Sequence, residues 1–189
     1  MLVYIFLAVL KVVIGQIGNS STLVADGANN ITDILSSVAV IYVLHLARRP
    51  PDDHHQYGHW KAEPIATFTT SLVMMAAGGS VIYSSIKQML TEQKTTPDIY
   101  ALFVGIFSAI VMYAIYLRNA HLAKKIKSGS LLAIAKDTRN DAWTSIGTSV
   151  TIIAANFNFA QLDNIVAMVI GSLILKTAYN ILTDSAFAL

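Results

Sequence analysis

Two pairs of oxygen-bearing side chains repeat one spacing within stretches that are otherwise apolar. Asn29 precedes Asp33 by four positions, and Asp137 precedes Asp141 by four. Four residues of an α-helix turn through about 400° and rise about 6 Å, so both members of a pair project from one helix face. Two such helices facing each other offer a cation three carboxylates and one amide oxygen. Because ionisable side chains at membrane depth mark functional sites by default, we interpret the four residues as a metal site.

The composition is that of a membrane protein. Apolar residues make up 54% of the 189 positions, charged residues make up only 13%, and the mean hydropathy is +0.57. The formal net charge of +2 is too small to favour a nucleic acid partner, and the basic residues gather in short connections rather than along a stripe. No cysteine is present, which excludes disulfides and thiolate metal ligands.

Six apolar runs have about the length that crosses a bilayer. A transmembrane helix needs about 20 residues to span about 30 Å of hydrocarbon. The first run lacks a small-residue cleavage site, so we do not interpret it as a signal peptide. We therefore predict an all-α membrane protein with six transmembrane helices, over residues 2–18, 22–46, 64–90, 99–118, 130–157 and 162–182.

Lys and Arg gather in two of the predicted connections. Three basic residues follow the second helix and five lie around the connection after the fourth, against two after the third. This bias predicts that both chain termini and both basic connections are cytoplasmic. Measured from the predicted helix ends, Asn29 and Asp33 lie about 14 to 20 Å into the membrane, and Asp137 and Asp141 about 12 to 18 Å from the opposite side. Both pairs are therefore expected near the midplane.

Hydrogen bonding between membrane helices is the alternative explanation for these polar residues. It suits Asn29, but three buried carboxylates repel one another unless a cation neutralises them, which favours a cation site. For Asp26 and Asn30, which neighbour the Asn29 and Asp33 pair on the same helix, we predict that they line the approach or bond neighbouring helices. Arg139 lies on the far side of its helix, where we expect it to snorkel or to form a structural pair.

A second cluster of metal-ligand residue types follows the second predicted helix. Asp52, His55 and His59 combine carboxylate and imidazole at a spacing that suits a metal, and Gly58 lets the chain fold around an ion. A solvated loop that only orients the second and third helices explains the same residues. The residues alone leave both interpretations open.

Together, these features resemble the cation diffusion facilitator family over essentially the whole chain. The loop is the most specific part, and it reads Asp-Asp-x-His-x-x-Gly-His-x-Lys-x-Glu at Asp52, Asp53, His55, Gly58, His59, Lys61 and Glu63. The resemblance implies a homodimer, alternating access and proton antiport. It also implies a midplane transport site at Asn29, Asp33, Asp137 and Asp141, and a secondary metal site at Asp52, His55 and His59. Family members usually carry a cytoplasmic domain after the sixth helix, which we expect this chain to lack.

The ligand types favour one group of metals. An all-oxygen set suits manganese, magnesium or calcium, whereas zinc and copper favour imidazole or thiolate. The resemblance narrows the choice to Mn²⁺, because an Asn-Asp-Asp-Asp set resembles the manganese-exporting branch and zinc-carrying members usually include a histidine. We therefore expect Mn²⁺/H⁺ exchange that removes metal from the cytoplasm. Zinc is the main alternative substrate, and iron(II), cobalt and cadmium are further candidates.

Functions of other classes fit the residues less well. A membrane-embedded metalloenzyme needs three protein ligands that leave one coordination position of the metal open for water. No His-Glu-x-x-His pattern, which would supply such ligands, is present in the sequence. A subunit that has lost transport and serves a partner would not need all four site residues. We therefore expect a secondary active transporter rather than an enzyme, with no cofactor beyond the transported ion, in a bacterial plasma membrane.

Overall fold

The computed structural model describes residues 2–47, 62–90, 97–126, 129–157 and 161–188, and nearly all of them are helical. The predicted all-α class is therefore confirmed. Within the described ranges the chain forms six α-helices: α1 (Leu2–Ile17), α2 (Ser21–Ala47), α3 (Ala62–Leu90), α4 (Ile99–Ile126), α5 (Gly129–Asn156) and α6 (Gln161–Ala188).

The fourth and sixth helices are longer than predicted. Hydropathy placed their ends at residues 118 and 182, but α4 continues to Ile126 and α6 to Ala188. Backbone hydrogen bonds of a helix do not require apolar side chains, so a helix can continue where the apolar run stops. In α4 the extension carries Lys124 and Lys125 in the last turn, where positive charge interacts favourably with the helix dipole.

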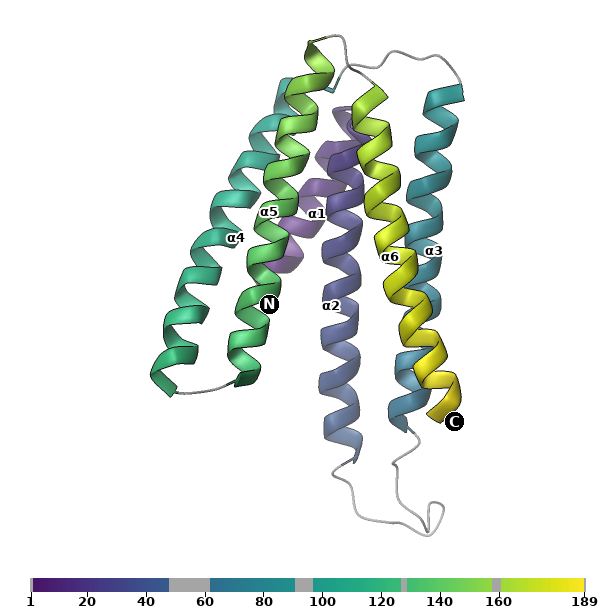
Figure 1. The fold of residues 1–189 in the computed structure, drawn as a ribbon, viewed down its shortest axis with the longest axis vertical. Helices are drawn as coiled ribbons and strands as arrows, with labels where there is room; N and C mark the ends of the chain where they lie inside the picture. The colour runs from purple at the N-terminus through teal and green to yellow at the C-terminus, as the bar shows by residue number, and fades with distance from the viewer. Residues whose placement is uncertain (1, 48–61, 91–96, 127–128, 158–160, 189) are drawn as a thin grey trace.

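The bundle consists of two helix pairs joined by α2. Helix α3 packs along α6, and α4 packs along α5. Helix α2 lies between the pairs and contacts α1, α3, α5 and α6, as Figure 1 shows. The two halves of the bundle therefore meet along α2, and α1 packs against α2 and α4.

Separate apolar clusters hold the two halves. Helices α2, α3 and α6 share a cluster around Ala25, Val81 and Ile174. On the other side, Leu7 of α1 and Met112 of α4 pack with Ala142 of α5. Most of these residues are Ala, Val, Ile or Leu, so helix backbones approach closely and dispersion contacts accumulate.

A short turn reverses the chain between α1 and α2. Asn19 has φ of 51°, in the left-handed region that Asn adopts more readily than most residues. Ser20 N donates to Gly15 O at 2.9 Å, which closes the end of α1. Ser20 Oγ then accepts from Leu23 N at 3.2 Å and caps the start of α2. We call this end of the bundle, at the top of Figure 1, the turn end.

Close packing of α1 against α2 depends on Gly27. A Cβ atom at Gly27 would lie 2.7 Å from Val12 Cγ2 and 3.0 Å from Lys11 Cβ. Any larger side chain would push the helices apart, so this glycine limits the distance between α1 and α2 at the level of Lys11 and Val12.

Three helices in the described part of the chain are long and apolar enough to cross a membrane, over residues 65–90, 99–126 and 161–187. Helix α1 is apolar but has only 16 residues. Helix α5 is the least apolar of the six and carries Asp137 and Asp141, and α2 carries Asp26 and Asp33. The six-span prediction thus stays a prediction for α1, α2 and α5.

Candidate cation site

A cavity of about 600 Å³ lies between α1, α2, α4 and α5. All four predicted transport-site residues line it. Tyr4 of α1, Asn119 of α4 and several residues of α2 and α5 complete the wall. The lining residues are Tyr4, Asn29, Asp33, Ile34, Ser36, Ser37, Asn119, Ile134, Asp137, Thr138, Asn140 and Asp141.

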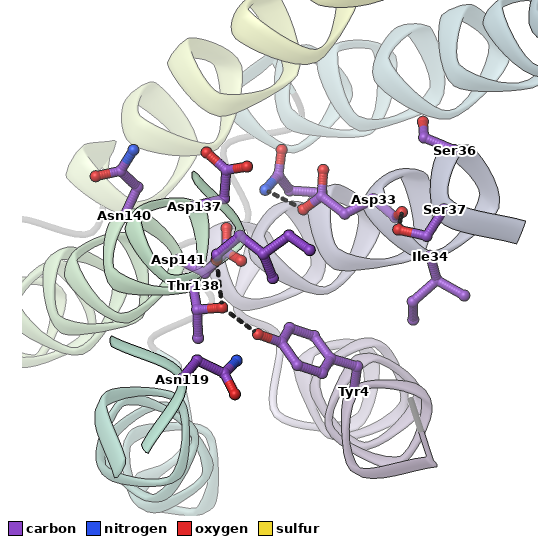
Figure 2. A pocket seen from close by; sticks show the side chains of 12 residues that line it. Tyr4, Asp33, Ile34, Ser36, Ser37, Asn119, Asp137, Thr138, Asn140 and Asp141 are labelled. Carbon is purple, nitrogen blue, oxygen red and sulfur yellow. Dashed lines mark hydrogen bonds between the residues drawn. The ribbon is translucent and has the colours of Figure 1, made fainter. Parts of the chain in front are cut away.

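The two predicted pairs meet across this cavity. Asp137 and Asp141 project from α5 towards Asp33 on α2, as Figure 2 shows. Asn29 Nδ2 donates to Asp33 Oδ2 at 3.3 Å. This hydrogen bond uses the amide nitrogen of Asn29 and leaves its carbonyl oxygen available as a ligand. The three carboxylates and one amide expected from the sequence thus line one cavity.

Hydroxyl side chains near the site bond back to their own helices. Thr32 Oγ1 donates to Asn29 O at 2.7 Å, Ser37 Oγ donates to Asp33 O at 2.8 Å, and Thr138 Oγ1 donates to Ile134 O at 2.9 Å. These local bonds give each hydroxyl group a partner within its own helix. Polar segments of α2 and α5 can therefore stay helical while the carboxylates point into the cavity.

The carboxylates line the cavity without closing into a cage. Among the described residues, no group of three His, Cys, Asp or Glu side chains lies close enough to hold a metal ion. Asp33 and Asp137 are exposed, and Asn29 and Asp141 are half-buried. A divalent ion with six waters occupies about 180 Å³, so a cavity of about 600 Å³ admits a hydrated cation. The arrangement suits an ion that arrives with part of its water.

Tyr4 and Asn119 extend the site beyond the residues that sequence reasoning found. The hydroxyls of Tyr4 and Thr138 are hydrogen-bonded, with their oxygens 2.5 Å apart. Asn119 adds an amide to the cavity wall from α4. A tyrosine in an apolar run and an asparagine beside a basic segment are weak signals, so only the packing of the helices identifies them.

A buried ion pair, also missed from the sequence, lies beside the cavity. Lys11 of α1 and Asp26 of α2 are both 0% exposed, and Lys11 Nζ lies 2.9 Å from Asp26 Oδ2. Lys11 Nζ also donates to Asn30 Oδ1 at 2.7 Å and to Ser145 Oγ at 2.8 Å. Asp26 and Asn30 thus bond a neighbouring helix, one of the two roles predicted for them. The only indication of this ion pair in the sequence was a lysine within the apolar run of α1.

A third group of polar side chains connects α6 to the start of α2 at the turn end. Asp163 of α6 accepts hydrogen bonds from Thr22 N at 3.2 Å, from Ser20 Oγ at 3.0 Å and from Thr22 Oγ1. A carboxylate at this place satisfies free N–H groups of α2 and interacts favourably with the helix dipole. The hydroxyls of Thr22 and Thr151 are also hydrogen-bonded, at 3.2 Å, which connects α2 to α5.

Two remaining predictions concern residues away from the cavity. Arg139 is exposed on α5, consistent with the far side of the helix. The predicted loop ligands Asp52, His55 and His59 lie outside the described residues. Metal binding by the loop therefore stays a prediction.

Comparison with known proteins identifies the family. The sequence matches the model of the cation efflux transmembrane domain over residues 1–189. The chain belongs to the cation efflux family. The predicted resemblance is thereby confirmed, and the apolar helices are those of a membrane protein.

Several bacterial proteins have related sequences. The chain is 43% identical to the manganese efflux system protein MneS of Bacillus subtilis, over 98% of this chain and 64% of that protein. It is 29% identical to the manganese efflux system protein MneP of the same organism, over 93% of this chain and 61% of that protein. It is 28% identical to the magnetosome protein MamM of Magnetospirillum gryphiswaldense, over 94% and 59%. The chain thus spans about three-fifths of the length of these relatives.

Proposed function

We propose that this chain is the transport unit of a divalent-cation efflux protein that exports Mn²⁺ from the cytoplasm in exchange for protons. The observation that carries the proposal is the cavity between α2 and α5, which Asn29, Asp33, Asp137 and Asp141 line together. Three carboxylates at one cavity within a membrane bundle need a cation or protons to neutralise them.

Ligand chemistry supports manganese as the substrate. The four side chains offer only oxygen atoms, which suit Mn²⁺ better than Zn²⁺ or Cu²⁺. Two of the related proteins are named manganese efflux systems. Zinc is the second candidate, with iron(II), cobalt and cadmium behind it, because carboxylates bind each of these ions. Selectivity for Mn²⁺ must come from ligand type and geometry, since intrinsic affinities favour the later metals.

The open arrangement of the carboxylates suggests how the site works. A hydrated ion enters the cavity from the cytoplasm, and α2 and α5 then draw together so that the side-chain oxygens replace its water. Rocking of the helices exposes the site to the outside, where protons compete the ion off the carboxylates. With no histidine among the four, the exchanged protons travel on Asp33, Asp137 and Asp141.

Several parts of the proposal concern the protein in its membrane. We propose that all six helices span a bacterial plasma membrane, with both termini of the chain on the cytoplasmic side. The protein works as a homodimer, and residues 1–189 form its transport domain. Asp52, His55 and His59 bind a second metal ion in the cytoplasmic connection between α2 and α3.

Metal uptake into proteoliposomes under a proton gradient tests the proposal. We expect wild-type protein to carry Mn²⁺ faster than Zn²⁺ and Asp33→Ala to carry neither. Asp184→Ala is the matched control, because Asp184 is an exposed aspartate of α6 that does not line the cavity. Equal loss in both variants would contradict a specific role for the cavity. Zinc flux at or above the manganese flux would overturn the choice of substrate but not the site.

A further inference from the structure

The ammonium group of Lys11 sits in a cage of oxygen atoms. Asp26 Oδ2, Asn30 Oδ1 and Ser145 Oγ lie 2.9, 2.7 and 2.8 Å from Lys11 Nζ. All four residues are fully buried. Removing two charges from water is unfavourable even when they pair, so a buried ion pair in this position calls for an explanation beyond helix packing.

This cage lies on the continuation of both ligand-bearing helix faces. Ser145 follows Asp141 by four residues on α5, and Asp26 precedes Asp33 by seven residues, or about two turns, on α2. Lys11 Nζ is therefore about one helical turn beyond the cavity, in the direction of the turn end. The ligand set of the cavity and the cage of Lys11 form consecutive polar levels between α2 and α5.

Polar contacts between α2 and α5 continue from this level to the turn end. Ser145 Oγ donates to Asp26 Oδ2 at 2.9 Å, and the hydroxyls of Thr22 and Thr151 meet at 3.2 Å. The other side of α2 packs in an apolar cluster with α3 and α6. The interface of α2 and α5 thus offers a cation a line of oxygen atoms from the cavity to the turn end.

We propose that Lys11 is the gate of a cation route that runs from the cavity to the turn end between α2 and α5. Asp26, Asn30 and Ser145, which hold the ammonium in this structure, receive the transported cation when Lys11 withdraws. The proposal rests on the proposed efflux function. Asp26 Oδ1 is buried and has no hydrogen-bond partner among the described residues, so this carboxylate has an oxygen to spare for an incoming ion.

Helix α1 is the element that moves when the gate opens. Its ammonium group and a divalent cation repel each other and cannot share one cage of oxygens, so Lys11 must leave before the ion passes. Gly27 lies against the Cβ of Lys11, and this close contact allows α1 to carry the ammonium to and from α2 by a small displacement. In the present structure the gate is closed while the cavity is open.

Accessibility of a single cysteine tests the gate. The 189 residues contain no cysteine, so Ile34→Cys introduces one thiol in the cavity wall without replacing a proposed ligand. A membrane-impermeant thiol reagent is applied to each side of reconstituted vesicles in turn. With Lys11 present, we expect fast labelling from the cavity side and slow labelling from the turn-end side. With Lys11→Met, the turn-end rate should rise at least about tenfold relative to the cavity-side rate.

Two further variants separate gating from misfolding. Lys11→Met leaves Asp26 buried without its cation, whereas Lys11→Met combined with Asp26→Asn removes both charges; both should open the turn-end side. Lys11→Arg keeps the charge and should keep the low rate. The ratio of the two rates within one vesicle preparation does not depend on the amount of folded protein. An unchanged ratio in both Met-containing variants would overturn the gate.

Binding of Mn²⁺ tests the second cation position. Electron paramagnetic resonance counts the Mn²⁺ bound per chain in detergent. We expect Lys11→Met to bind one ion more than wild type, and Lys11→Met with Asp26→Asn to lose that extra ion. Equal stoichiometry in all three would overturn the cation position. Neither experiment requires transport, so a gate without Mn²⁺ flux would refute the proposed function alone, and flux without the labelling change would refute the gate alone.

Discussion

Four aspartates between α2 and α5 have two different environments. Asp33 and Asp137 are exposed to the cavity and Asp141 is half-buried there, whereas Asp26 is fully buried against Lys11. Residue type is the same in all four, so the partner of each carboxylate decides its role. Within the described ranges, the three cavity aspartates form no ion pair like that of Asp26 with Lys11, so they are available for an ion or a proton.

Replacing Asn29 by histidine should change metal preference. Asn29→His adds an imidazole to the proposed ligand set, and imidazole favours Zn²⁺. We expect the ratio of zinc to manganese flux in proteoliposomes to rise roughly tenfold, which corresponds to about 1.4 kcal/mol. Asn140→His, at a cavity-lining residue outside the four ligands, is the control. An unchanged ratio in Asn29→His would mean that selectivity arises outside these four residues.

Replacing Asp141 by asparagine should separate metal binding from proton exchange. Asp141→Asn keeps the size of the side chain and an oxygen atom but cannot release a proton at neutral pH. We therefore expect metal-driven acidification or alkalinisation of the vesicle lumen to disappear, and the same for Asp137→Asn. A pH-sensitive dye in the lumen measures it, with Asp184→Asn as the control. Unchanged coupled flux in Asp137→Asn or Asp141→Asn would end the proposed mechanism.

At the residue scale, the spacing of two residues in the sequence predicted their relative position when both residues lay on the same helix. The four-residue intervals correctly predicted that Asn29 with Asp33, and Asp137 with Asp141, share a helix face and line one cavity. The cage of Lys11 comes from three helices. Asp26 and Asn30 are four residues apart on α2, but no interval within the sequence connects them to Lys11 or to Ser145. Tertiary packing alone brings the three helices together at this point.

At the scale of elements, the contact of α1 with α2 depends on residues without a side chain, among them Gly27. A methyl group at Gly27 would meet Val12 and Lys11 within 3.0 Å. Gly147 of α5 has nothing within 4 Å of the corresponding position. The two glycines therefore make a matched pair for mutation.

Alanine substitutions at these glycines should have opposite effects on stability. Gly27→Ala should lower the free energy of unfolding by about 1 to 3 kcal/mol, because the added methyl group overpacks the α1–α2 contact. Gly147→Ala should raise it by up to about 1 kcal/mol through helix propensity. Thermal unfolding in detergent measures both. Destabilisation by Gly147→Ala equal to that of Gly27→Ala would show that the contact is not the cause.

Helix existence was easier to predict than helix length. All six elements were expected, but α4 runs to Ile126 rather than to residue 118. The prediction ended where Arg118 interrupts the apolar run, yet the backbone continues its hydrogen bonds through a polar segment. Hydropathy indicates whether a segment is surrounded by lipid or by water. It does not indicate where the backbone hydrogen bonds of the helix end.

At the scale of the whole molecule, the two ends of the bundle are fastened differently. At the turn end, Asp163 of α6 accepts hydrogen bonds from α2, and the hydroxyls of Thr22 and Thr151 connect α2 to α5. Towards the other end, the cavity separates α2 from α5. The sequence predicted neither the difference between the ends nor the pairing of the helices, because both depend on contacts between residues far apart in the chain.

A reversible cross-link at the turn end should stop transport. Thr22→Cys with Thr151→Cys places two thiols where the hydroxyls now lie 3.2 Å apart. Oxidation to a disulfide should hold α2 against α5 and abolish Mn²⁺ flux in proteoliposomes, and a reductant should restore it. Each single cysteine variant is the control for side-chain loss. Full flux in the oxidised double variant would mean that transport does not require these helices to separate.

The count of carboxylates at the cavity has a consequence for the response to membrane voltage. Moving one net charge through the membrane potential changes the free energy by about 2.3 kcal/mol per 100 mV. Asp33, Asp137 and Asp141 with one divalent cation carry one net negative charge, and the same three with two protons carry the same charge; the pair of Lys11 and Asp26 adds none. Membrane voltage then acts equally on the metal-bound and the protonated site. An exchange of one Mn²⁺ for two protons moves no net charge across the membrane.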